Sequence, residues 1–198
     1  MMQQTDEVEG IRLLTVGHSI YPMLDFIELI RLHGIEVIVD VRSNPYSRYA
    51  THFHGPLLKK SLAEKHLKYV FLGAELGGKP KEQEFYDQDG HLNYERLANS
   101  TKFKTGMDRL EKGLSLYRVA IMCGEEDPGN CHRHLLISKV AIQKGYKVSH
   151  IRKGGTLQSY EELLALEEES DGHTQLTLFG ESSEKQKANR RSRSRIRD

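Results

Sequence analysis

The sequence lacks any apolar run of about 18 residues, the length that a membrane-spanning helix needs. Its first residues, Met1 to Glu7, also lack the basic and apolar segments of a secretory signal. With only two cysteines among 198 residues, the chain cannot hold a framework of disulfides. These absences argue against a membrane protein and against a disulfide-stabilised secreted protein, and they predict a cytoplasmic protein with reduced thiols.

The polar residues of the chain are concentrated at its C-terminus. Hydrophobic residues make up 37% of the chain, which is low for a globular protein. Residues 181–198 hold seven Lys or Arg and three Asp or Glu, a net charge of +4 within a chain of net charge +1. A segment this polar cannot bury enough apolar surface to fold. We therefore expect a flexible N-terminus over residues 1–10, a single domain over residues 11–169 and a disordered tail over residues 170–198.

Apolar runs typical of strands alternate with amphipathic segments typical of helices. Strands are expected at residues 11–17, 35–41, 67–72, 116–122 and 147–151, and helices at residues 22–33, 56–66, 94–112, 131–144 and 160–169. A glycine follows three of these helices just before a strand, at Gly34, Gly113 and Gly145, where helices commonly end. This order predicts an α/β fold, with a mostly parallel sheet and helices on both faces in a Rossmann-like arrangement.

In a parallel sheet, the loops at the carboxyl ends of the strands meet around one crevice. The run Cys123–Arg133 forms such a loop, and it holds both cysteines beside a histidine and an arginine. Cys131 begins a helix, whose N-terminus favours a thiolate, and His132 and Arg133 add to that preference. Cys123 is either a nucleophile or a small buried side chain.

Two further interpretations of the cysteines meet objections. A redox pair is disfavoured because eight positions separate Cys123 from Cys131, unlike the spacing of a C-x-x-C motif. A zinc site formed by Cys123, Cys131 and His132, with His18 as the fourth ligand, is disfavoured because adjacent residues fit poorly around a tetrahedral ion. We therefore assign no metal ligands, and the sequence identifies no cofactor.

Carboxylates offer a second catalytic chemistry at the same edge of the sheet. Glu125 lies in the cysteine loop and Asp40 ends the second expected strand, so the two can act as an acid–base pair. His18, which follows the first strand, and His132 are candidates for moving protons. Asp40 has the simpler alternative of an ion pair with Arg42, and Glu125 that of complementing the dipole of a helix N-terminus.

A third group of residues suits an anionic substrate. Arginine binds phosphate through paired N–H donors, and hydroxyl groups, glycine backbone and helix N-termini add further donors. The candidates for binding a substrate or its phosphate are Ser19, Arg42, Ser43, Ser47, Arg48, Glu75, Gly77, Gly78 and Arg133. The loop after the second strand also carries Tyr46, Tyr49 and residues 52–54, which suit stacking on a base or sugar. The alternative for this loop is a solvated surface segment.

Four motifs stand in order along the chain. They are Thr-Val-Gly-His-Ser at Thr15–Ser19, Val-Asp-Val-Arg-Ser-Asn-Pro-Tyr-Ser-Arg at Val39–Arg48, Glu-Leu-Gly-Gly at Glu75–Gly78, and Cys-x-Glu-x-x-Pro-x-x-Cys-His-Arg at Cys123–Arg133. In combination they resemble the widespread prokaryotic family called domain of unknown function four-eight-eight, from about Leu13 to about Arg152. The resemblance implies a compact α/β domain and no established reaction.

The tail holds a short motif of its own. Residues Gln175–Phe179 read Gln-Leu-Thr-Leu-Phe, which resembles the pentapeptide by which bacterial repair and replication proteins dock on the sliding clamp, with Thr in place of Ser or Asp. The predicted partner-binding residues are Gln175, Leu176, Leu178 and Phe179, since an extended segment can insert its apolar side chains into a pocket. The alternative is that they pack back onto the domain. The Arg-rich end, residues 190–197, is expected to contact DNA phosphates, or else only to keep the protein in solution.

Together these features predict an enzyme that processes nucleic acid or a nucleotide, as a hydrolase or transferase associated with DNA repair. Its catalytic candidates are Cys123, Glu125, Cys131, His132, His18 and Asp40, and its tail recruits it to the clamp and to DNA. One alternative is a non-catalytic adaptor that binds nucleic acid or nucleotides, in which the Cys-His-Arg turn is architectural. A further alternative is a metal-dependent hydrolase.

Overall fold

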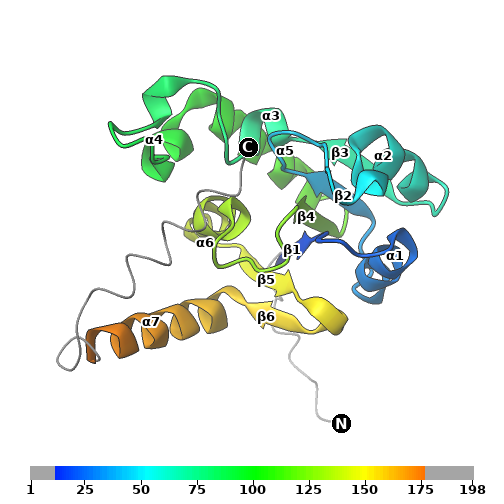
Figure 1. The fold of residues 1–198 in the computed structure, drawn as a ribbon. Coiled ribbons are helices and arrows are strands. Elements are labelled where there is room, and N and C mark those ends of the chain that lie inside the picture. The colour runs from blue at the N-terminus through cyan, green and yellow to red at the C-terminus, as the bar shows by residue number, and fades with distance from the viewer. Residues whose placement is uncertain (1–11, 177–198) are drawn as a thin grey trace, which may run out of the picture. The chain divides into compact units, whose positions relative to one another are not determined.

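The computed structural model in Figure 1 describes residues 12–176, with side chains up to residue 169. The chain divides into two units, one ending at Tyr160 and the other beginning at Glu161. The expected flexible N-terminus lies outside the described residues, as do Leu178, Phe179 and the Arg-rich end. Gln175 and Leu176 are described by their backbone alone.

The first unit contains one sheet with the strand order β3-β2-β4-β1-β5-β6. Its strands are β1 (Arg12–Gly17), β2 (Val37–Asp40), β3 (Lys68–Phe71), β4 (Val119–Cys123), β5 (Lys147–Ile151) and β6 (Leu157–Ser159). Neighbouring strands run parallel, except for the antiparallel pair β5 and β6. The predicted mostly parallel sheet is confirmed. The sequence pattern does not predict β6, because a strand of three residues is too short to show an alternation.

Helices cover both faces of this sheet, with α1 and α2 on one side and α6 on the other (Figure 1). The helices of the first unit are α1 (Met23–Leu32), α2 (Gly55–Ala63), α3 (Gly73–Leu76), α4 (Tyr94–Asn99), α5 (Thr101–Leu114) and α6 (Lys139–Gln143). Shorter turns are η1 (Thr51–Phe53), η2 (Gln83–Phe85), the π-helical η3 (Arg133–Ser138) and η4 (Lys153–Gly155). The predicted α/β architecture is therefore present.

The apolar core on the α1 side is built from alternate strand residues and the facing helices. It contains Leu14, Val16, Ile38, Ala120, Met122 and Ile151 from the strands, and Phe26, Ile27, Ile30, Phe53, Leu58 and Leu62 from α1, η1 and α2. Burial of each of these side chains other than Ala120 stabilises the fold by roughly 1.5–3 kcal/mol. This packing holds the strands in a fixed order, so that the loops at their carboxyl ends also take fixed positions.

Two of the three glycines at which helices are expected to end do follow the end of a helix. Gly34 and Gly145 have φ angles of 63° and 88°, in the left-handed region that favours glycine after a helix. Gly113 does not, because α5 continues through it to Leu114. The expected single helix over residues 94–112 is instead two helices, and the side chain of Ser100 caps the second by accepting a hydrogen bond from the amide of Phe103.

Strands β1 and β4 are neighbours whose following connections run in opposite directions across the sheet. The chain leaves β1 through α1 toward β2, and leaves β4 through η3 and α6 toward β5. Gly17 at the end of β1 pairs in register with Cys123 at the end of β4. A Cβ atom on Gly17 would lie 1.8 Å from the carbonyl oxygen of Glu125, so only glycine allows this approach. This is the topological switch point at which α/β proteins bind ligands.

The second unit is described only along part of its length. Helix α7 (Tyr160–Leu176) begins at the end of the first unit and continues past its expected end at Glu169. Of the helices in residues 12–176, none combines the length and the apolar character needed to cross a membrane.

Candidate active site

The two cysteine sulfurs and the imidazole of His132 lie together at the switch point. Cys123 ends β4 with 8% of its surface exposed, and its Sγ lies 3.8 Å from Nδ1 of His132. The Sγ of Cys131 lies 3.8 Å from the same nitrogen. These three atoms are all within 4.8 Å of one another. The loop over residues 124–130 therefore brings both sulfurs to one point despite their separation in sequence.

His132 is oriented by the main chain of the neighbouring strand. Its Nε2 lies 3.0 Å from the carbonyl oxygen of Val41, an atom that only accepts, so Nε2 carries a proton and donates it. In the neutral ring this leaves Nδ1 as an acceptor facing the sulfurs. Gly78 packs against the ring, since a Cβ there would lie 2.5 Å from Cγ of His132. Of the predicted glycine pair, Gly78 is thus part of the site, where the absence of a side chain gives His132 room.

The two thiols share one proton rather than ionising together. A hydrogen bond from Cys131 is the main cause that lowers the pKa of the Cys123 thiol, and His132 and the charge of Arg133 lower it further. The same bond, together with burial, raises the pKa of Cys131. These opposite shifts of the two pKa values favour the thiolate on Cys123. This differs from the preference of the sequence patterns for Cys131, because Cys131 serves as the donor to its neighbour.

Arg133 supports the cysteine loop from inside. It is fully buried, and its guanidinium donates to the carbonyl oxygens of Glu125 and Glu126. Its Nε is buried without a partner among the described residues. The first turn after Arg133 is π-helical, and Ser138 Oγ donates to the carbonyl of Arg133 at 2.6 Å. Arg133 therefore holds the loop and places a positive charge near the sulfurs, and it does not face solvent as a phosphate ligand would.

Asp40 and Arg42, on either side of Val41 in the sequence, form a buried ion pair. Arg42 Nε donates to Asp40 Oδ1 at 2.9 Å, and Arg42 Nη2 donates to Asp40 Oδ2 at 2.6 Å. The hydroxyl of Tyr69 donates to the same carboxylate at 2.8 Å, and Arg42 also reaches the carbonyl oxygen of Phe53 at 2.9 Å. The structure thus realises the ion-pair alternative for Asp40, and it leaves neither group free to act as a base or as an anion clamp.

His18 lies at the same edge but has both ring nitrogens occupied. Its Nδ1 is 2.8 Å from the carbonyl oxygen of Ser19, and its Nε2 is 3.0 Å from Nη1 of Arg42. The ring stacks on Phe53 at a centroid distance of 4.3 Å. Burial, followed by the charge of Arg42, lowers the pKa of His18 to about 4. His18 is therefore neutral and held in place, with no free nitrogen for carrying protons.

The remaining predicted residues have local contacts of their own. Ser43 Oγ accepts a hydrogen bond from the amide of Lys79 at 2.8 Å, and a Cβ on Gly77 would lie 2.5 Å from it. Ser47 Oγ accepts from the amide of Ala50 at 3.1 Å. Glu75 forms an ion pair with Arg109. Arg48 lies 6.0 Å from the centre of the Tyr49 ring, and both Arg48 and Glu125 are exposed. The site also uses the Val41 carbonyl and the Tyr69 hydroxyl, which the motifs do not reveal.

Comparison with protein families matches residues 23–140 to the domain of unknown function DUF488. The chain belongs to the DUF488 family. The matched residues include the cysteine loop and the Asp40–Arg42 pair, whereas His18 precedes them. No curated protein and no solved structure gives a match to the chain. The family expected from the four motifs is thus confirmed.

Three polar side chains of this DUF488 domain form a row of hydrogen bonds inside the core. Thr15 Oγ1 lies 2.8 Å from Nδ1 of His150, and Nε2 of His150 lies 3.2 Å from Nδ1 of His134. All three residues are buried. Burial, followed by the charges of His134 and Arg133, lowers the pKa of His150 to about 3. His150 therefore stays neutral in the folded protein far below the pH at which an exposed histidine is protonated.

This depressed pKa predicts a loss of stability in acid. Above about pH 6.5 His150 is neutral in both states, but below it the unfolded chain takes up a proton that the folded chain excludes. The free energy of unfolding should therefore fall by about 1.4 kcal/mol per pH unit on account of this residue, down to about pH 3. Urea unfolding of the wild type and of His150→Gln, compared at about pH 6.5 and about pH 4.5, measures the difference in slope.

Replacement of the exposed His91 by Ala provides the control. In this variant the free energy of unfolding should change with pH as it does in the wild type. Equal slopes for the wild type and His150→Gln would contradict the assignment of a neutral buried imidazole at position 150.

Proposed function

We propose that this DUF488 protein is a cysteine-dependent enzyme, a hydrolase or transferase that acts on a nucleotide or nucleic acid. The observation that carries the proposal is the placement of Cys123 Sγ at the β1/β4 switch point, 3.8 Å from Nδ1 of His132. The other nitrogen of His132 is held by the Val41 carbonyl. A nucleophile beside a base, with the base oriented by a third group, is the general arrangement of covalent catalysis.

The reaction that follows from this geometry has two halves. The thiol of Cys123 first gives its proton to Nδ1 of His132. The thiolate then attacks the electrophilic atom of the substrate and forms a bond to it, while the leaving group departs with that proton from Nδ1. Water then attacks the same atom, His132 takes the proton of that water, and the bond to sulfur breaks. In a transferase another acceptor replaces the water. The thiol of Cys131 stabilises the thiolate before attack by donating to it.

The structure supports the thiol chemistry over the carboxylate chemistry. Asp40 is fully buried and bound by Arg42 and Tyr69, so it cannot take a proton from a substrate. Glu125 is exposed, and its carbonyl rather than its carboxylate is bound by Arg133. An acid–base pair of Asp40 and Glu125 is therefore not assembled, whereas the thiol and the imidazole are.

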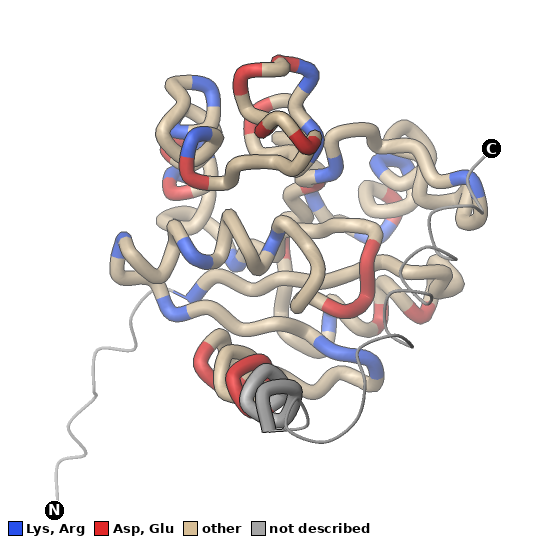
Figure 2. Tube along the Cα trace, turned by 60° about the vertical axis from the view of Figure 1, so that its left-hand side comes forward, with Lys and Arg blue, Asp and Glu red and all other residues tan. Residues whose placement is uncertain are grey.

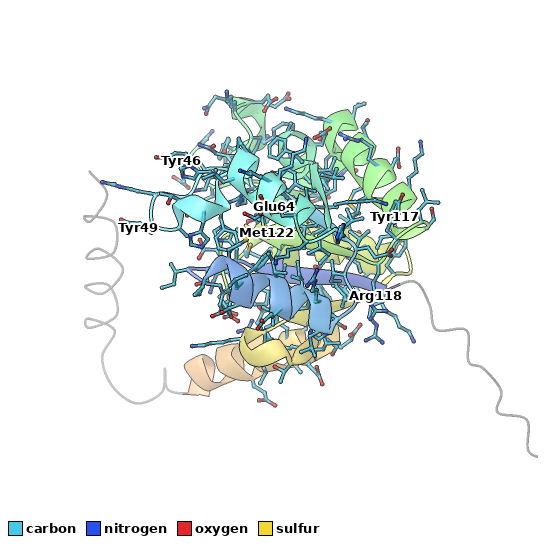
Figure 3. The ribbon with its side chains drawn as sticks, turned by 90° about the vertical axis from the view of Figure 1, so that its right-hand side faces the viewer. Tyr46, Tyr49, Glu64, Tyr117, Arg118 and Met122 are labelled. Atoms are coloured by element: carbon cyan, nitrogen blue, oxygen red, sulfur yellow. The ribbon has the colours of Figure 1, made fainter. Side chains whose placement is uncertain are left out.

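The loop between β2 and η1 supports a substrate that contains a base. It begins at Val41, beside His132, and exposes two aromatic rings, Tyr46 and Tyr49, which are 61% and 86% exposed (Figure 3). Tyr46 stacks on His54 at a centroid distance of 4.1 Å, which leaves its other face open. Exposed aromatic rings beside a cation such as Arg48 suit the stacking of nucleobases.

Removal of the nucleophile tests the proposal. Cys123→Ser should lower turnover by at least about a thousandfold, since a hydroxyl is a far weaker acid than a thiol and does not supply the anion that attacks. Cys131→Ser should lose about ten- to a hundredfold, because it weakens one hydrogen bond to a charged group. Glu125→Gln is the control and should retain activity. Turnover is measured by mass spectrometry on nucleoside phosphates and on single- and double-stranded oligonucleotides.

Alkylation gives a test that needs no substrate. Iodoacetamide at neutral pH should label Cys123 faster than glutathione, and faster than Cys131, because the pKa of Cys123 is lowered. Labelling of Cys123 no faster than glutathione, or full turnover by Cys123→Ser, would show that the cysteine is structural. Either result would favour the adaptor alternative.

The substrate class is tested at the aromatic loop. The double variant Tyr46→Ala with Tyr49→Ala should weaken binding of a fluorescent single-stranded oligonucleotide about tenfold or more, since stacking contributes about 1–3 kcal/mol per base. The matched control is Tyr117→Ala, whose ring lies apart from the loop (Figure 3) and under Lys68. Unchanged affinity in the double variant, or an equal loss in the control, would refute a stacking role for the loop.

We also propose, from the sequence pattern, that the tail recruits the enzyme to DNA in the cytoplasm through Gln175–Phe179 and the Arg-rich end. If so, the whole chain binds purified bacterial sliding clamp, and Leu178→Ala with Phe179→Ala abolishes that binding because it removes both apolar anchors. Surface plasmon resonance measures the difference, and equal affinities would end the proposal.

A further inference from the structure

We propose that Cys123, Cys131 and His132 form a binding site for a thiophilic divalent cation, with zinc as the ion their chemistry favours. Two sulfurs and one imidazole nitrogen are the donor set that selects zinc over magnesium or calcium. The three donor atoms lie within 4.8 Å of one another, with both cysteines buried and His132 half-buried. The inference concerns binding alone and stands whether or not the proposed function holds.

The distances fit tetrahedral coordination with little adjustment. Zinc with Zn–S bonds of about 2.3 Å and a Zn–N bond of about 2.0 Å holds each sulfur about 3.5 Å from the nitrogen at a tetrahedral angle. Both Sγ–Nδ1 distances in the protein are 3.8 Å. Both Sγ–Nδ1 distances therefore come within a few tenths of an ångström of those that a bound ion needs.

The surroundings of His132 match those of a metal ligand. A ligating histidine usually donates its second ring nitrogen to a carbonyl or carboxylate, which fixes both its tautomer and its direction. His132 donates Nε2 to the Val41 carbonyl at 3.0 Å and is packed by Gly78. The lone pair of Nδ1 is therefore already directed at the point between the sulfurs.

Charge gives a reason for a cation at this point. Without one, the neighbouring sulfurs cannot both carry a negative charge, and a proton must remain between them. A divalent cation replaces that proton, and two thiolates neutralise it fully. Binding should therefore release a proton, and it should be stronger than at any site that offers only carboxylates.

The objection that the sequence raises against such a site does not hold in the folded chain. Cys131 and His132 are adjacent, yet Sγ and Nδ1 converge because the chain turns into the helical segment at His132, with φ −57° and ψ −22°. His18, the expected fourth ligand, is occupied at both nitrogens by Ser19 and Arg42. The site therefore has three protein ligands and one open position, as in zinc sites that exchange a ligand.

Occupation of the site by zinc would also control the chemistry proposed above. The ion would bind the sulfur and the nitrogen that the thiolate mechanism needs, so the metal and the covalent reaction exclude each other. A zinc-bound protein would be inactive as a cysteine enzyme and would recover when a chelator removes the ion.

Cobalt provides the direct test, because sulfur bound to Co²⁺ gives an ultraviolet charge-transfer band that nitrogen and oxygen ligands do not give. The reduced full-length protein, titrated with Co²⁺, should show this band with one ion per chain, and Zn²⁺ should abolish it. Either Cys123→Ser or Cys131→Ser should reduce the band to about half or less and weaken binding, and His132→Gln should weaken binding. Circular dichroism checks that each variant is folded.

The chain offers a matched control in a second group of possible ligands. Asp87, Asp89 and His91 also lie close together, but all three are exposed and none has sulfur. His91→Ala should leave the charge-transfer band and its stoichiometry unchanged. Absence of the band in the wild type, or its survival when both cysteines are replaced by serine, would overturn the inference.

Turnover of the same protein, measured with and without Zn²⁺, distinguishes the metal site from the proposed function. Turnover that falls when Zn²⁺ is added and returns with a chelator supports both proposals. Turnover that requires Zn²⁺ keeps the metal site and refutes Cys123 as a free nucleophile. Turnover that depends on Cys123 while no Co²⁺ band forms keeps the proposed function and refutes the metal site.

Discussion

The buried ion pair of Asp40 and Arg42 is the interaction on which the site depends. Burial of two charges is costly unless their hydrogen bonds are complete, and here Tyr69, the Phe53 carbonyl and the ring of His18 complete them. The pair encloses Val41 in the sequence, so it fixes the carbonyl that orients His132. Loss of either charge would leave the other unpaired in the core and would release the imidazole from the sulfurs.

The same three atoms can support either a thiolate or a metal ion, and the difference lies in what sits between the sulfurs. A proton leaves one reactive thiolate beside an imidazole, which suits a covalent reaction. A divalent cation engages both sulfurs and the nitrogen and leaves one open position. The geometry required by the two states is nearly the same, since both need Nδ1 of His132 directed at the sulfurs. On the two proposals above, the supply of metal would therefore decide whether the site can carry out the covalent reaction.

The sequence predicts the features that depend on patterns along the chain, such as strands and helices. It does not predict the role of a side chain where that role depends on neighbours in space. Apolar runs and the glycines at 34 and 145 reveal the strands, the helices and the convergence of the loops, because each reflects local periodicity or backbone conformation. The use of Arg42 and Arg133 for internal support cannot be read from residue type, since an arginine in a loop looks the same whether it faces a carbonyl or a phosphate. The Val41 carbonyl leaves no signal at all, because every residue has one. The choice of Cys123 over Cys131 depends on how the two neighbouring thiols lower and raise each other's pKa, which no pattern in the sequence reveals.

The internal use of two arginines changes how a substrate with phosphates would be held. Among the described residues, the positions of Lys and Arg are interspersed with those of Asp and Glu along the trace (Figure 2). Broad electrostatic attraction is therefore a weak source of affinity for this domain. Arg48 remains exposed beside Tyr49, in the loop that starts at the site, so recognition would depend on stacking with one nearby cation. Such binding varies less with salt than binding to a basic groove and favours an unpaired base, because only an unstacked base exposes both of its faces.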